Sequence, residues 1–250
     1  MTDYAGHETI SGFVSDLRSY DIADLDAATL EGLLGRVSSS DFVAGCIHHL
    51  VQDQKDLSST PGLSFYAVTL RFPTVLANAL AMIVKEIEDL RLSGAYELAE
   101  QLSLIKSKFI QLSCGNDQEA EEETMYDLRG DHCGLYLTDH PELRSANPAM
   151  IKNSPFWDYC TRLTEERNIM RLIGAIMESE QGGVTEIVTA AEVGLINRGY
   201  YYELHVKAEV MHGNIAEEIA RMCKVVPEWK VLFLRGMALH RDWYARATGL

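Results

Sequence analysis

The chain has 250 residues, 47% of them hydrophobic and 24% charged, which is ordinary for a soluble globular protein. Its formal net charge of −15 argues against nucleic acid or an anionic membrane as the main partner, because both are bound by basic faces. The five cysteines are scattered without a C-x-x-C pair, so we expect reduced thiols in a cytoplasmic protein. The N-terminus lacks the order of a signal peptide, and charges interrupt each apolar stretch before the length of about eighteen residues that spans a bilayer.

Apolar residues recur at helical spacing along almost the whole chain. Pro73 suits the first turn of a helix, so we expect a helix to begin there, and Gly182-Gly183 is expected to separate two further helices. The proline-bearing stretch 140–155 is predicted to be a loop between helices. In chain order, the predicted helices cover residues 25–37, 42–50, 73–87, 96–112, a segment ending near 137, 156–180, 184–197, 200–223 and 227–247.

These elements predict an all-α fold. The sequence has no alternating β pattern of any length, no G-x-G-x-x-G and no P-loop, so a nucleotide-binding α/β fold is not expected. Helices with short connections favour one compact bundle in which facing helices combine their side chains. We therefore predict a single domain over 1–250, with N-terminal helices in 1–60, a metal-binding core in 70–225 and a C-terminal helix in 226–250.

The strongest functional pattern lies on the predicted helix 200–223. His205, Glu209 and His212 fall within one narrow stripe, because at about 100° per residue Glu209 lies about 40° and His212 about 20° from His205. The surrounding residues are mostly apolar, and burying three polar groups without partners would cost several kcal/mol. A metal ion between them would offset that cost, and nitrogen and oxygen ligands suit iron, manganese or zinc. The alternative is a solvated helix face.

A second carboxylate is expected from the helix 156–180. Glu178 follows an apolar surface on which Gly174 would allow close approach of another helix. At that depth a lone carboxylate would be protonated or expelled, so Glu178 is a candidate ligand. Glu180, near the predicted end of the helix, is expected to be solvated.

An earlier segment offers a further pair of candidates, Glu122 and His132. On an unbroken helix they would lie roughly 80° apart, and a bulge near Gly130 would bring them together. Neighbouring carboxylates in the run 119–123 compete with Glu122 for this role. The alternative for His132 is a surface or hydrogen-bonded core histidine.

Together, Glu122, His132, Glu178 and the motif H-x3-E-x2-H at 205–212 resemble the haem-oxygenase-like diiron oxidases and oxygenases, a family related to the TenA-like and PQQ-synthase-like folds. The family pattern is a Glu followed by a His, a Glu on a middle helix, and H-x3-D-x2-H on a late helix. The resemblance covers residues 70–225. Glu209 departs from the pattern, because it stands where the family usually has Asp.

The resemblance implies a seven-helix bundle that binds two Fe(II) ions per chain and uses O2 as co-substrate. It also implies a small substrate bearing a carboxylate, amino-acid-like or fatty-acid-like, that undergoes oxidative C–C or C–N cleavage or N-oxygenation. A homodimer is common for such bundles. The implied ligands are Glu122, His132, Glu178, His205, Glu209 and His212. The candidates for a cation that holds the substrate carboxylate are Lys152, Arg162, Arg167, Arg171 and Lys207.

Two other functions fit an all-α chain of this kind. One is a metal-independent oxidase or a TenA-like hydrolase of the same fold, and the hydrolase would need a cysteine nucleophile in its pocket. The other is a non-enzymatic helical protein whose acidic face binds a partner.

Overall fold

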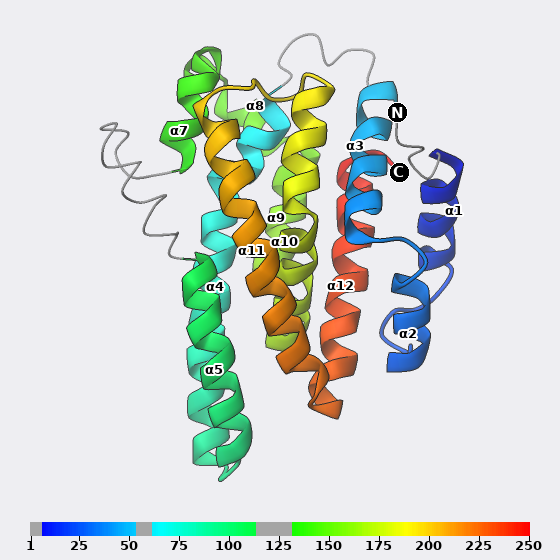
Figure 1. Ribbon diagram of the computed structural model, residues 1–250, viewed down its shortest axis with the longest axis vertical. Coiled ribbons are helices and arrows are strands. Elements are labelled where there is room, and N and C mark those ends of the chain that lie inside the picture. The colour runs from blue at the N-terminus through cyan, green and yellow to red at the C-terminus, as the bar shows by residue number, and fades with distance from the viewer. Residues whose placement is uncertain (1–6, 54–61, 114–131) are drawn as a thin grey trace.

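The computed structural model describes residues 7–53, 62–113 and 132–250, and among these it contains eleven α-helices, one short 3-10 helix and no strand. The prediction of an all-α fold is therefore confirmed. Figure 1 shows the long helices α10, α11 and α12 side by side, with α4 and α5 on one flank and α1 to α3 on the other. The elements are α1 (His7–Arg18), α2 (Ala27–Leu34), α3 (Ser39–Asp53), α4 (Leu63–Leu92), α5 (Tyr96–Ser113), α7 (His132–Asp139), η2 (Pro141–Ser145), α8 (Pro148–Lys152), α9 (Pro155–Glu165), α10 (Ile169–Glu192), α11 (Tyr200–Lys224) and α12 (Pro227–Ala247).

Helix α10 is the central element, since it packs against α3, α11 and α12. Its contact with α12 is close because each helix places a glycine at the crossing. A Cβ on Gly174 would overlap the backbone of Phe233, and a Cβ on Gly236 would overlap the backbone of Arg171. The expectation that Gly174 permits close helix approach is therefore confirmed.

The boundaries of α10 differ from the prediction. The stretch predicted as one helix, 156–180, is interrupted after Glu165. The Glu166 carboxylate accepts a hydrogen bond from the backbone N–H of Asn168 at 2.7 Å, and the Asn168 side chain then caps α10 by accepting from the N–H of Arg171 at 3.0 Å. The predicted break at Gly182-Gly183 is also wrong, because both glycines are buried inside α10 where neighbouring side chains fill the space beside them.

Helix α4 begins ten residues earlier than predicted and carries Pro73 in its interior. Proline removes one backbone hydrogen bond, but buried residues on both sides of it, such as Phe65 and Val75, hold the helix together by packing. By length and composition α4 is able to cross a membrane, so the expectation that no apolar stretch reaches about eighteen residues is wrong for this helix. Within the fold, α4 packs on α5, α9 and α10.

The stretch 140–155 is more ordered than predicted, because it contains η2 and α8. The side chain of Asn147 accepts a hydrogen bond from the N–H of Ala149 at 2.9 Å and begins α8, whose first helical residue is a proline. Helices α5, α11 and α12 lie within two residues of their predicted bounds.

Candidate metal centre

Helices α10 and α11 pack against each other and form one wall of an apolar cavity of about 310 Å³. The predicted stripe of α11 faces it, since His205, Glu209 and His212 all line the cavity. Both histidines are buried. The carboxylate of Glu209 lies over Gly183 of α10, where an added Cβ would overlap it. The glycine that was expected to end a helix therefore provides the space for this carboxylate.

Three side chains form a group able to hold a metal ion. One ligand atom each from Glu180, Glu209 and His212 lies within 4.8 Å of the others. His212 Nδ1 lies 3.4 Å from Glu180 Oε2 and 3.8 Å from Glu209 Oε1. The other ring nitrogen of His212, Nε2, is buried and has no hydrogen-bond partner among the described residues. Two carboxylates and an imidazole are a donor set that suits iron, manganese or zinc.

The charge of this group favours a cation. Burial lowers the pKa of His212, but the carboxylates of Glu180 and Glu209 more than offset this by hydrogen bonding and charge, and raise the pKa to about 11. The imidazolium is thus the cation that balances two buried carboxylates. A divalent metal ion would take its place and release the proton, as metal ions do at histidine ligands.

His205 lies in the same cavity with a defined orientation. Its Nδ1 lies 3.0 Å from the backbone carbonyl oxygen of Tyr201, which only accepts hydrogen bonds, so Nδ1 carries a proton. In the tautomer with the proton on Nδ1, Nε2 is the lone-pair nitrogen. The Tyr201 ring stacks on the imidazole at 3.8 Å between centroids, and its hydroxyl lies 3.3 Å from Thr69 Oγ1 of α4.

A third carboxylate of the cavity, Glu186, comes from the next turns of α10. Its Oε1 accepts a hydrogen bond of 2.7 Å from the hydroxyl of Tyr244 in α12. Burial raises the pKa of Glu186, the bond from Tyr244 lowers it, and the charges of Glu209 and Glu180 raise it, with the result at about 7. Glu186 is therefore able to hold or release a proton near neutral pH.

The rest of the cavity is apolar. Its wall on α4 includes Phe65, Phe72, Leu76 and Leu80, and α5 contributes Leu112. No lysine or arginine lines it among the described residues, and none of the five predicted cations for a substrate carboxylate does so. The fifth, Arg171, donates a hydrogen bond to Glu166 at 2.9 Å. The other four are exposed on the surface: Lys152, Arg162, Arg167 and Lys207.

Glu178 is buried as predicted, but it lies away from this group. Its Oε1 accepts a hydrogen bond of 2.6 Å from Nε of Arg241, and both side chains are at most 2% exposed. Arg241 Nη1 also donates to the backbone carbonyls of Leu34 and Val37. The guanidinium, not a metal ion, balances the charge of Glu178. Glu178 therefore lies outside the group that could hold a metal ion, whose carboxylate on α10 is that of Glu180, about 200° further round the same helix.

The early pair of predicted ligands is not tested. Glu122 lies outside the described residues, and His132 is described only as the first residue of α7, without its side chain. The expectation that Glu180 is solvated is wrong, because α10 continues through Gly182-Gly183 and buries it, and Glu186 was not among the predicted ligands. A helix continued through the glycines would have placed both carboxylates among its interior positions.

Comparison with family models, with curated proteins and with solved structures finds no match to this chain.

Proposed function

We propose that this protein is a non-haem iron oxidase or oxygenase of the haem-oxygenase-like kind, with its metal centre on α10 and α11. The observation that carries the proposal is the buried group of Glu180, Glu209 and His212 at the wall of an apolar cavity. The buried, unpartnered Nε2 of His212 and the space that Gly183 leaves for Glu209 both fit a bound cation.

These three residues would hold one iron. The second iron that the resemblance implies would draw on His205 and Glu186, which line the same cavity. Bound ferrous iron supplies the electrons that dioxygen chemistry needs. The surrounding residues would orient the ligands: Tyr201 directs Nε2 of His205, and Tyr244 holds one oxygen of Glu186 so that the other is available to a metal ion.

The cavity favours a substrate with an apolar body. The α4 wall would pack along an alkyl or aromatic chain and exclude water, while the polar end of the substrate faces α10 and α11. Because no described lysine or arginine lines the cavity, a carboxylate head would have to be held by the metal itself. Of the two expected substrate types, the fatty-acid-like one fits the apolar α4 wall better than an amino acid does.

The alternative hydrolase finds less support. Cys46, Cys160 and Cys223 are buried, burial raises the pKa of each thiol to about 12, and none of them lines the cavity. Such thiols are poor nucleophiles. Cys133 is described but does not line the cavity either, and Cys114 lies outside the described residues.

The test is anaerobic loading with Fe(II), removal of free metal, and measurement of bound iron and of oxygen uptake. We expect at least one equivalent of iron per chain and oxygen consumption on mixing with O2. Glu209→Gln should lose the iron, while Glu203→Gln, an exposed carboxylate on the same helix, should keep it. Iron binding without oxygen uptake would refute the oxidase and leave a metal site, and no bound metal at all would refute both.

A further inference from the structure

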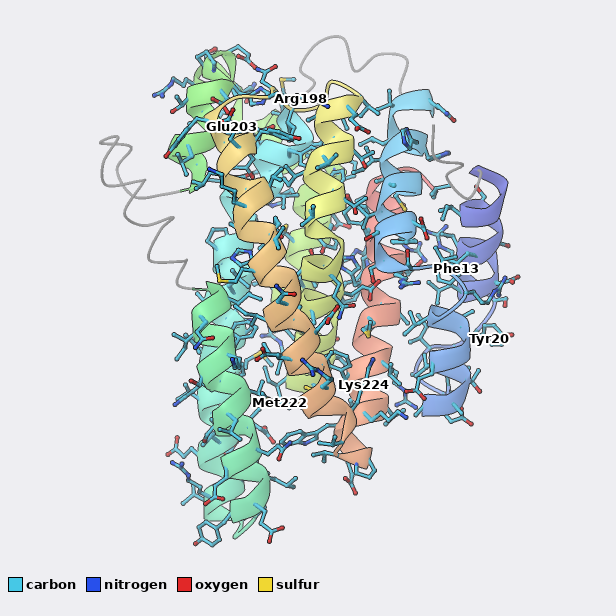
Figure 2. The ribbon with its side chains drawn as sticks, viewed as in Figure 1. Phe13, Tyr20, Arg198, Glu203, Met222 and Lys224 are labelled. Carbon is cyan, nitrogen blue, oxygen red and sulfur yellow. The ribbon has the colours of Figure 1, made fainter. Side chains whose placement is uncertain are left out.

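A second cavity, of about 370 Å³, lies on the opposite flank between α1, the turn after it, α12 and the start of α10. Four arginines line it, and we call it the arginine cavity. Helix α12 contributes one stripe with the spacing i, i+4, i+7, i+11. Figure 2 shows Tyr20, a residue that is 48% exposed, on the same flank as α1 and α2. The arginines are Arg18, Arg171, Arg235 and Arg246, and the carboxylates in the lining are Asp21 and Asp242.

The guanidinium groups are only partly satisfied by the protein. Asp242 accepts from Nε of Arg18 at 2.7 Å and from Nε of Arg246 at 2.9 Å, so two cations share one carboxylate. Among the described residues, Arg235 donates only to the backbone carbonyl of Leu25, from Nε at 3.3 Å and from Nη2 at 2.9 Å. Each guanidinium has five N–H donors, and most of these make no bond to the described residues.

Arg171 completes the set from the first turn of α10. It lies beside Arg235 because Gly236 lets the backbones of α10 and α12 meet at Arg171. One of its Nη atoms donates to Glu166, which does not line the cavity, while its Nε is buried without a hydrogen-bond partner among the described residues. A buried donor without a partner costs free energy that a ligand acceptor would recover.

The local charge is opposite to that of the whole chain. The lining carries four guanidinium groups against two carboxylates, in a protein of net charge −15. Even with Glu166 counted, the cations exceed the carboxylates by one. Cations gathered on one side of an acidic protein repel one another, and an anion between them would relieve that repulsion.

We propose that the arginine cavity binds the phosphate group of a small molecule. Forked donors arriving from three helices suit a tetrahedral dianion with several acceptor oxygens, whereas a carboxylate is satisfied by one fork. The exposed ring of Tyr20 at the cavity offers an apolar contact to the rest of a phosphate monoester. This site is separate from the metal centre, since the two cavities share no lining residue.

Binding is tested on the full chain by titration calorimetry at low ionic strength, with inorganic phosphate, phenyl phosphate and acetate. We expect one saturable site for both phosphates, tighter for phenyl phosphate, and much weaker binding of acetate. Equal affinity for the two phosphates would mean that the site recognises the phosphate group and makes no favourable contact with the phenyl ring. Acetate binding as tightly as phosphate would overturn the assignment to phosphate.

The matched variants are Arg246→Ala and Arg162→Ala. Both arginines are about half exposed, at 56% and 47%, and both pair with an aspartate one helical turn earlier, but only Arg246 lines the cavity. Arg246→Ala should weaken phosphate binding by about fivefold or more, and Arg162→Ala should not change it. Arg235→Lys keeps the charge and removes the fork, so it should also weaken binding. No saturable binding, or equal affinities in all variants, would overturn the proposal.

Discussion

Replacing either of two carboxylates of α10, Glu178 and Glu180, by glutamine should have opposite effects on stability and on iron affinity. Glu180→Gln removes a carboxylate from the group that we propose to hold the metal ion, whereas Glu178→Gln removes the anion that balances buried Arg241. Both changes keep the shape of the side chain and delete one negative charge. The pair therefore separates metal binding from stability within a single helix.

The expected magnitudes follow from the contacts. Removing one partner of a buried ion pair costs about 3–5 kcal/mol. Gln keeps an acceptor oxygen for Arg241 Nε, and Arg241 keeps its bonds to Leu34 and Val37, so we expect the lower end, about 3 kcal/mol. Glu180→Gln in the metal-free protein leaves Glu209 beside His212 to balance its charge, so it should cost less stability than Glu178→Gln. Its affinity for Fe(II) should fall by at least about 100-fold, because even residues that only support ligands contribute 10- to 100-fold.

The assays are equilibrium urea unfolding of the metal-free proteins and anaerobic competition for Fe(II) against a coloured chelator. Glu178→Gln should show a lowered midpoint and normal iron affinity under conditions where it is folded. Glu180→Gln should show the reverse. A folded Glu178→Gln protein without iron, beside a Glu180→Gln protein with full iron, would refute the reasoning and restore Glu178 as the ligand.

Three further predictions concern the space beside Glu209, the buried His240 and the apolar cavity. Gly183→Ala should lower iron affinity about tenfold, because the added Cβ displaces Glu209, while the higher helix propensity of alanine raises stability by up to about 1 kcal/mol. The control is Gly213→Ala, whose added Cβ would come no closer than 3.8 Å to any described heavy atom of another helix and which should leave iron affinity unchanged. Burial and the charge of Arg241 lower the pKa of His240 to about 3, so its contribution to stability is complete above pH 6.5 and is lost as the pH falls toward 3. Below pH 6.5, urea unfolding should therefore show the wild type losing up to about 1.4 kcal/mol per pH unit more than His240→Phe, and equal slopes would contradict this. Leu76→Trp should fill the apolar cavity, abolish binding of an apolar dye and leave bound iron unchanged, and retained dye binding would place the dye elsewhere.

The parts of the fold that follow from local sequence were predicted well. Helices α5 and α12 have continuous amphipathic patterns, and α12 begins at Pro227, where the fixed φ of proline suits the first turn. The stripe of His205, Glu209 and His212 was also predictable, because helical spacing alone places three residues on one face. In these cases the deciding interactions lie within a few residues of one another.

The errors arose where residues distant in sequence decide the outcome. Gly182-Gly183 has the composition of a turn, and only the neighbours across the interface, Val43 and Glu209, explain why the helix continues through it. Pro73 has the properties of a helix start, and only the packing of the turns before it keeps it inside α4. Local propensities of about 1–3 kcal/mol are smaller than the burial of several apolar side chains, so packing overrides them.

The different surroundings of Glu178 and Glu180 have the same origin. Each is a carboxylate beside apolar residues on α10, and each is buried in the fold. A buried carboxylate needs a cation, and which cation it meets depends on the helix that it faces. Glu178 faces Arg241, which lies 63 positions further along the chain, and Glu180 faces His212. Since a rotation of about 200° separates the two directions, assigning the ligand requires knowing which side of α10 each neighbouring helix occupies, and that is a property of the whole bundle.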